Sequence, residues 1–151
     1  MRYVTVRPAR LSERKSLEQL QWRASLNNPG DREALLAHPD VIELPARRIE
    51  DGLVFVAEAA GSVRGFAAIL PRADGDSELD ALFVEPDAWR NGVGRALVEH
   101  CIAEASASGA TSLHVIGNPH AEGFYLACGF KALGTKEMRF GVGLLLKRDL
   151  R

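Results

Sequence analysis

The sequence predicts a mixed α/β (α+β) fold in which helices pack on one central, mostly antiparallel sheet. Three observations support this. Alternating β-branched and apolar residues occur at both ends of the chain, a strand–turn–strand pattern lies near its middle, and one long amphipathic segment separates two further strand patterns. A strand, a helix and a strand in that order form a crossover whose strands run parallel. The expected element order is β-α-α-β-β-β-α-β-α-β-β.

The amino-terminal part is expected to form a strand and two helices. Residues 3–9 (YVTVRPA) alternate and include β-branched side chains, which is typical of a strand. A first helix is expected over 12–25, capped by the serine at its start. The sequence NNPGD at 27–31 breaks this helix, and its aspartate can cap a second, shorter helix. The segment 39–51 is expected to be irregular.

A hairpin and the crossover follow. The stretch GLVFVAEAAGSVRGFAAILPR predicts strands at 53–58 and 63–70, joined by the turn AAGS. After a turn-rich connection, ELDALFVEP predicts a strand that ends near Pro86. A helix is expected from about Gly92 to Ser106, because apolar residues recur there with helical spacing and a Ser-Gly pair follows.

The carboxyl-terminal part completes the sheet. The sequence SLHVI predicts the second crossover strand at 112–116, and HAEGFYLAC predicts a short helix at 120–128. Two last strands are expected at 131–135 and 143–148. Because no internal repeat or linker interrupts these patterns, we expect a single domain over 1–151.

Composition excludes several functional classes. The chain has 151 residues, 46% hydrophobic and 26% charged, and a net charge of −1. This charge gives no reason to expect binding to nucleic acid or to a membrane surface, and no apolar run of about 18 residues predicts a membrane span. Cys101 and Cys128 are too few and too far apart for a metal site or a disulfide framework, so we expect buried thiols, no metal and a cytoplasmic location.

The sequence WRNGVGRAL places Gly92 and Gly94 where the long helix begins. Either they form a tight turn, or they let a ligand approach the backbone closely. The amino terminus of a helix, with its unpaired N–H groups, suits a phosphate. Two phosphate-binding patterns are absent, because no Gly-Lys-Ser or Gly-Lys-Thr occurs and Leu97 replaces the third glycine of the dinucleotide motif.

A second motif, NPHAEGFYLACGF, follows the crossover. Together with LFVEPDAWRNGVGRAL it resembles the GNAT superfamily of acetyl-CoA-dependent N-acetyltransferases, which carry [Q/R]-x-x-G-x-[G/A] before the helix and N-x-x-A-x-x-F-Y-x-x-x-G-F after the next strand. The paired motifs cover residues 78–130. The resemblance implies the GNAT fold for the whole chain. One position departs from the pattern, since Trp89 stands where the family has Gln or Arg.

The resemblance implies that acetyl-CoA is the cofactor. Its pyrophosphate would lie on the backbone amides that open the long helix, and its pantetheine arm would run along the preceding strand. The cofactor-binding residues implied are Leu82, Phe83, Val84, Arg90, Asn91, Gly92, Val93, Gly94, Arg95, Ala96, Asn118, Ala121, Phe124 and Tyr125.

The resemblance also suggests the catalytic groups. Tyr125 would be the general acid that protonates the departing thiolate, unless it is only a packed helix tyrosine. Glu78 and Asp80 share one face of their strand, and either could be the general base, with Glu78 preferred for its longer reach; the alternative is that both are merely solvated. Asn118 could bind pantetheine, cap the next helix, or do both. His114 is expected to be structural.

The acceptor pocket of the family is usually walled by the first two helices and their connection, which points to Trp22, Arg23, Asn27 and Asn28, together with the last two strands. The favoured alternative is that these four residues belong to an ordinary helix end. The predicted function is acetyl transfer to a primary amine of a small molecule or peptide. The alternatives are a non-catalytic acyl-CoA sensor or regulatory protein, and an enzyme that acetylates protein or tRNA. Dimerisation is common in the family, so the resemblance also favours a homodimer.

Overall fold

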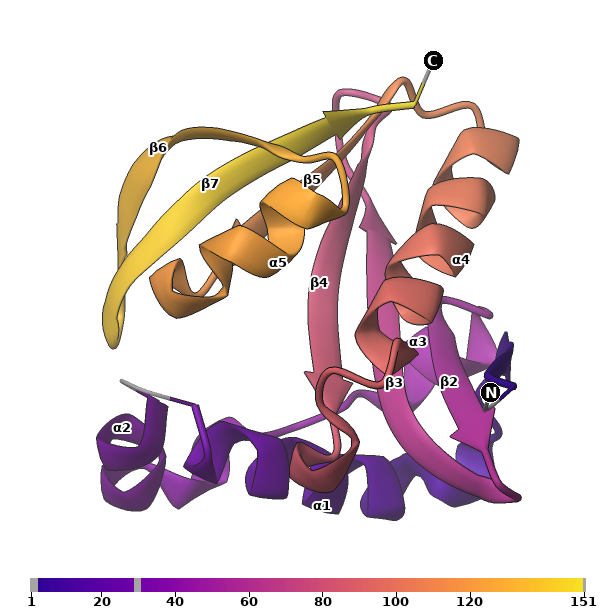
Figure 1. Ribbon diagram of the computed structural model, residues 1–151, viewed down its shortest axis with the longest axis vertical. Coiled ribbons are helices and arrows are strands. Elements are labelled where there is room, and N and C mark those ends of the chain that lie inside the picture. Colours follow the sequence, from indigo (N-terminus) through magenta and orange to yellow (C-terminus); the bar gives the residue numbers. More distant parts are fainter. Residues whose placement is uncertain (1–2, 29–30, 151) are drawn as a thin grey trace. The chain divides into compact units, whose positions relative to one another are not determined.

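The computed structural model describes residues 3–28 and 31–150 (Figure 1). The strands are β1 (Thr5–Pro8), β2 (Val54–Ala59), β3 (Ser62–Pro71), β4 (Ser77–Val84), β5 (Ser112–Gly117), β6 (Lys131–Met138) and β7 (Gly141–Asp149). The helices are α1 (Arg14–Leu26), α2 (Asp31–Ala37), α3 (Ala46–Glu50), α4 (Val93–Ala107) and α5 (Glu122–Ala127). Short 3-10 turns occur at η1 (Leu11–Glu13), η2 (Pro39–Val41), η3 (Pro86–Ala88) and η4 (Pro119–Ala121).

The strands form one mixed sheet in the order β1-β2-β3-β4-β5-β7-β6. The β4–β5 pair is parallel, with Ser77 opposite Leu113 and Leu79 opposite Val115. The pairs β1–β2, β2–β3, β5–β7 and β6–β7 are antiparallel. The mixed, mostly antiparallel sheet and the single parallel crossover are therefore confirmed.

Two expectations about the amino-terminal helices were wrong. Ser12 does not cap the first helix; it lies inside η1, where the Glu13 carboxylate accepts the backbone N–H of Arg10 at 2.8 Å. The segment 39–51 is not irregular, because it contains η2 and α3. The expected break at 27–31 includes Pro29 and Gly30, which lie outside the described residues.

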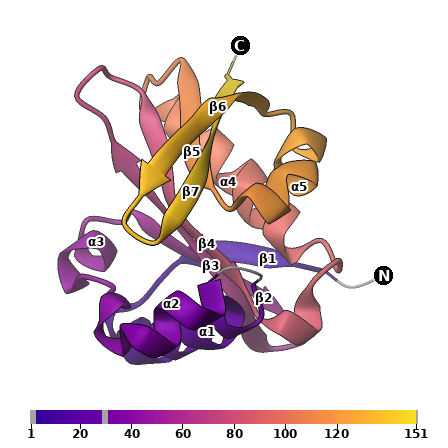
Figure 2. The same ribbon diagram turned by 90° about the vertical axis from the view of Figure 1, so that its left-hand side faces the viewer.

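The chain divides into two compact units, each described here by itself. The first comprises residues 1–68 and 81–97. Its core joins β2 and β3 to α1, where alternate strand residues meet the apolar stripe of the helix. Helices α1 and α2 lie side by side (Figure 2). The buried core residues are Leu17, Leu20, Leu44, Ile49, Val54, Val56, Phe66 and Ala68.

The second unit comprises residues 69–80 and 98–151. Leu113 and Val115 of β5 and Leu146 of β7 are buried on one sheet face, and α5 lies against that face (Figure 1). Strand β6 forms the edge of the sheet, and all its residues are exposed. Because the period of a strand is two, the alternate residues His114 and Ile116 point to the other face.

Helix α4 continues through both units and ends as predicted. Gly109 follows it with a φ of +93°, the left-handed conformation that glycine adopts without strain. The buried residues of this helix are Val93, Leu97, Val98, Cys101 and Ala105. No helix among the described residues is long and apolar enough to cross a membrane.

Candidate active site

The glycine turn before α4 has a left-handed backbone at two positions. Arg90 has a φ of +68° and Gly92 a φ of +82°. A Cβ on Gly92 would meet nothing within 4 Å, so the chain itself leaves open space there. Glycine is thus favoured at position 92 by backbone conformation, and the turn presents bare backbone to the outside. Gly94, by contrast, lies inside the helix.

The first turn of α4 directs backbone N–H groups outward. The Ala96 N–H bonds to the Gly92 carbonyl at 3.0 Å. The N–H groups of Val93, Gly94 and Arg95 precede this bond and, by helix geometry, have no acceptor within the helix. The positive end of the helix dipole adds to them. This arrangement can bind an anion, and with 15 residues the helix is long enough for its dipole to matter.

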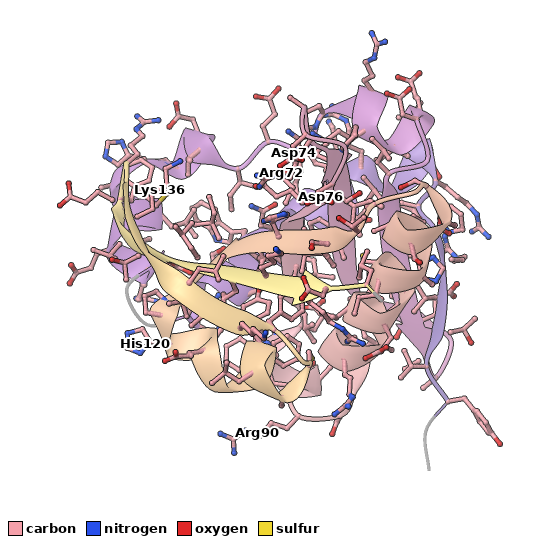
Figure 3. The ribbon with its side chains drawn as sticks, turned by 90° about the horizontal axis from the view of Figure 1, so that it is seen from above. Arg72, Asp74, Asp76, Arg90, His120 and Lys136 are labelled. Carbon is pink, nitrogen blue, oxygen red and sulfur yellow. The ribbon has the colours of Figure 1, made fainter. Side chains whose placement is uncertain are left out.

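Trp89 has a structural role in the same connection. Its indole Nε1–H donates to the Val84 carbonyl at 2.8 Å, which ties the turn to the end of β4. The residue remains 40% exposed. The side chain of Arg90 points outward from the ribbon (Figure 3). Position 89 therefore supplies a strand-end hydrogen bond in place of a polar side chain directed at a ligand.

The second half of β4 is half-buried at Leu82, Phe83 and Val84. The Phe83 ring packs on Phe66, with ring centroids 5.6 Å apart. On the adjacent strand, a Cβ on Gly65 would lie 2.9 Å from the Phe83 carbonyl oxygen. Because the Phe83 side chain packs against the core, this residue could contact a ligand only through its backbone.

Tyr125, in the second unit, is buried within α5 with 7% of its surface exposed. Its ring meets those of Phe124 and Phe130 edge to face, at centroid distances of 5.2 and 5.6 Å. Burial raises the pKa of the phenol to about 12. The hydroxyl is therefore protonated at neutral pH and can act as a proton donor.

Asn118 caps the turn that leads into α5, which confirms the capping alternative. Its Oδ1 accepts the backbone N–H of His120 at 2.9 Å, and Pro119 occupies the first position of η4. The other predicted residues of this segment, Ala121 and Phe124, are half-buried. The segment from 118 to 125 thus fixes the helix that carries the tyrosine.

Glu78 and Asp80 lie at alternate positions of β4, as expected. Glu78 is half-buried, and its Oε1 lies 3.7 Å from Nη1 of Arg72. Asp80 is exposed. Glu78 is also the parallel-strand neighbour of His114. Of the two carboxylates, Glu78 is the less exposed.

Asp76, which sequence reasoning did not single out, organises the turn before β4. Its Oδ1 accepts from the Thr111 backbone N–H at 3.0 Å, the Thr111 hydroxyl at 3.0 Å and the Ser112 N–H at 3.1 Å. Its Oδ2 lies 3.0 Å from Nε2 of His114. These bonds, led by the one to His114, hold the pKa of the Asp76 carboxyl well below its usual range. His114 is therefore hydrogen-bonded within the fold, which is compatible with the expected structural role.

The carboxylates Asp74 and Asp76 and the His114 imidazole have ligand atoms within 4.8 Å of one another, which is a spacing suited to a metal ion. Arg72 faces Asp74, with Nη2 3.0 Å from Oδ2, and this hydrogen bond lowers the pKa of the Asp74 carboxyl (Figure 3). Asp76 accepts the bonds described above. The Asp74 carboxylate is thus paired with Arg72, and the Asp76 carboxylate is hydrogen-bonded within the chain.

An open pocket of about 430 Å³ lies in the first unit, at the end of α1. Arg23 makes two hydrogen bonds to Glu85, at 2.9 and 2.7 Å, and the Asn27 side chain donates to the Arg23 carbonyl at 2.9 Å. The bond to Glu85 raises the pKa of Arg23. The pocket is lined by Arg23, Leu26, Asn27, Arg64, Glu85, Pro86 and Asp87.

This pocket contains only part of the predicted acceptor set. Arg23 and Asn27 line it, whereas Trp22 and Asn28 are half-buried elsewhere on α1 and its end. Sequence reasoning missed a second ion pair in the lining, between Arg64 and Asp87. Opposite charges were visible in the sequence, but nothing in their spacing showed that they would meet.

Comparisons with known proteins agree on one family. The model of the acetyltransferase (GNAT) family matches residues 14–130. A peptidyl-lysine N-acetyltransferase, YjaB of Salmonella typhimurium, is 42% identical over 60 residues, which are 40% of this chain and 40% of that protein. The aligned stretch thus spans less than half the length of this curated relative.

Solved structures share the fold. A GCN5-related N-acetyltransferase from Rhodopseudomonas palustris superposes with a TM-score of 0.81 at 21% identity, over 96% of this chain and 94% of that one. An N-acetyltransferase from Thermoplasma acidophilum, solved in complex with coenzyme A, gives a TM-score of 0.77 at 17% identity, over 97% and 99% of the two chains. At these identities the likeness shows the fold alone.

Proposed function

The chain belongs to the GNAT family of acetyltransferases, and we propose that it transfers an acetyl group from acetyl-CoA to a primary amine of a small molecule or peptide, with Tyr125 as general acid. The observation that carries this proposal is the position of Tyr125, which is buried on the short helix that follows the Asn118 cap. A titratable group whose pKa is shifted by burial is a candidate for a functional group, because such shifts occur often at active sites.

The residues at the start of α4 fit the pyrophosphate of acetyl-CoA. The open turn at Gly92 and the outward N–H groups of Val93 to Arg95 offer several donors and the positive end of a helix dipole. Arg90 and Arg95 are exposed and add positive charge. The backbone of Leu82 to Val84 would hold the pantetheine arm through strand-like hydrogen bonds.

Acetyl-CoA, when bound, supplies an acetyl group as a thioester. The chain must then manage two protons. The Tyr125 hydroxyl, which is protonated at neutral pH, donates a proton to the sulfur that leaves, and the second proton lost by the attacking nitrogen restores the phenol. The Glu78 carboxylate, directly or through water, accepts the other from the acceptor ammonium; Asp80 is the second choice for this role.

A lysine side chain of a peptide is one acceptor of the required class. The relative from Salmonella typhimurium is named a peptidyl-lysine N-acetyltransferase, and lysine carries a primary amine. The pocket lined by Arg23, Asn27, Glu85 and Asp87 presents both carboxylates and guanidinium groups. In this lining Glu85 is paired with Arg23 and Asp87 with Arg64, so an acceptor amine bound there would share these carboxylates with the guanidinium groups.

The test is acetyl-CoA turnover with a panel of amines and lysine peptides. We expect Tyr125→Phe to lower kcat by about 100- to 10,000-fold while the KM for acetyl-CoA stays unchanged. Tyr3→Phe is the matched control, because Tyr3 is the other tyrosine of the chain and is 84% exposed. An unchanged kcat in Tyr125→Phe, with chemistry rate-limiting, contradicts the acid role. Tight coenzyme A binding with no acceptor acetylated would support an acyl-CoA sensor instead.

A further inference from the structure

Gly117, the last residue of β5, lies directly against the Tyr125 ring. It is buried and pairs with Leu144 of β7. A Cβ built on Gly117 would lie 2.7 Å from Cε2 of Tyr125 and 3.3 Å from its Cδ2. It would also lie 3.3 Å from Cδ1 of Leu146. The ring therefore occupies space that any other residue at 117 would fill.

The backbone at Gly117 does not itself require glycine. Its φ lies outside the left-handed region, where Gly92 and Gly109 are found. An alanine could adopt this conformation, so the constraint comes from the tyrosine ring. That ring has little freedom to withdraw, because Phe124 and Phe130 meet it edge to face.

We propose that Gly117 is a positioning residue for the general acid. Because it has no side chain, it leaves the space that the Tyr125 ring occupies, and it thereby fixes the position of the phenol oxygen. The inference rests on the proposed function of Tyr125. It assigns to Gly117 a role in the reaction that acts only through the tyrosine hydroxyl.

The size of the effect follows from the contact distance. Ordinary contacts of a Cβ begin at 3.4 Å, so a contact of 2.7 Å obliges the ring to move by the difference, about 0.7 Å. Displacements near 1 Å in a catalytic group cost up to about 100-fold in rate. We therefore expect Gly117→Ala to lower kcat by about 10- to 100-fold and to leave the KM for acetyl-CoA unchanged.

A double-mutant cycle separates positioning from simple destabilisation. Phenylalanine has the same ring carbons as tyrosine, so the clash of Gly117→Ala persists in Tyr125→Phe while the hydroxyl is gone. We expect Gly117→Ala to lower the stability of both backgrounds equally. The loss in kcat should appear only when Tyr125 is present. An equal loss of kcat in both backgrounds would overturn the proposal, as would no loss in either.

The four proteins are prepared in a Gly123→Ala background. Gly123 lies on α5, a Cβ there would meet nothing within 4 Å, and alanine favours the helix. Gly123→Ala alone is the matched control and should leave kcat unchanged. If Gly117→Ala does not fold in this background, the proposal is wrong, because it requires that one added methyl group shift the ring and leave the protein folded.

Labelling with 3-fluorotyrosine supplies a readout independent of rate. The chain has two tyrosines, and Tyr125→Phe identifies the signal of Tyr125. Gly117→Ala should shift that signal and leave the Tyr3 signal in place; an unmoved Tyr125 signal counts against the proposal. If Tyr125→Phe itself has no effect on kcat, the proposed function fails first. If Tyr125→Phe lowers kcat but Gly117→Ala does not, this inference fails and the proposed function stands.

Discussion

The Asp76 carboxylate joins two segments that are 35 residues apart in sequence, through its bonds to Thr111 and Ser112. It lies next to Ser77, where β4 begins its parallel pairing with β5. A single side chain thereby helps to fix the register of the crossover. The carboxylate must be ionised to accept all its hydrogen bonds, so this contribution to stability depends on pH.

The sign of that pH dependence follows from the lowered pKa of Asp76. Its ordinary pKa is 3.8, so the stabilisation is fully present above that value and is lost as pH falls toward the lower folded pKa. We expect Asp76→Asn to have a lower unfolding free energy than the wild type near neutral pH. This difference in unfolding free energy should become smaller below about pH 4. Urea unfolding at several pH values measures this. Asp40→Asn, at an exposed residue of η2, is the control. A difference in unfolding free energy between Asp76→Asn and the wild type that does not change with pH contradicts the prediction.

At the scale of elements, the turn into α4 combines a stability requirement with a proposed binding role. Alanine at position 92 would have to adopt a φ near +82°, which costs about 1–2 kcal/mol for a residue with a Cβ. We expect Gly92→Ala to lose about that much unfolding free energy and to raise the KM for acetyl-CoA. Denaturant unfolding and steady-state kinetics measure the two effects.

Gly75→Ala is the matched control for that variant. Gly75 has a φ of +89° and, like Gly92, no atom within 4 Å of a built Cβ. Its loss of stability should be similar, whereas its KM for acetyl-CoA should not change. Equal rises of KM in the two variants would mean that the turn before α4 has no special part in binding.

Local patterns explain which elements could be predicted. Strands and α4 follow from alternation and helical spacing, which act over a few residues. Helix α3 was missed because its five residues, of which only Ile49 is buried, are too few to show a helical apolar pattern. A helix this short is not stable by propensity alone and depends on the surrounding fold. Ser12 was a reasonable cap by residue type, but the helical turn begins earlier, at Leu11, so Ser12 lies inside it.

For the whole molecule, the order of elements and the parallel crossover were predictable, because short connections and the crossover pattern leave few topologies. Which residues meet in each site was harder to predict from the sequence. Arg23 and Glu85 are 62 residues apart in sequence, and only the fold brings them into one pocket. The close contact between Gly117 and Tyr125 could not be predicted either, because a glycine at the end of a strand can occur for several other reasons.

The two cysteines have a practical consequence for measuring this protein. Cys101 and Cys128 are buried, and burial raises the pKa of the Cys101 thiol to about 12. A chromogenic disulfide reagent should therefore leave the folded chain untouched and colour only with coenzyme A released by turnover. Adding denaturant afterwards should expose both cysteines, so that the reagent titrates two thiol equivalents per chain. One sample then gives both the amount of coenzyme A released and the amount of protein. Rapid colour before any acetyl-CoA is added would show that the core opens.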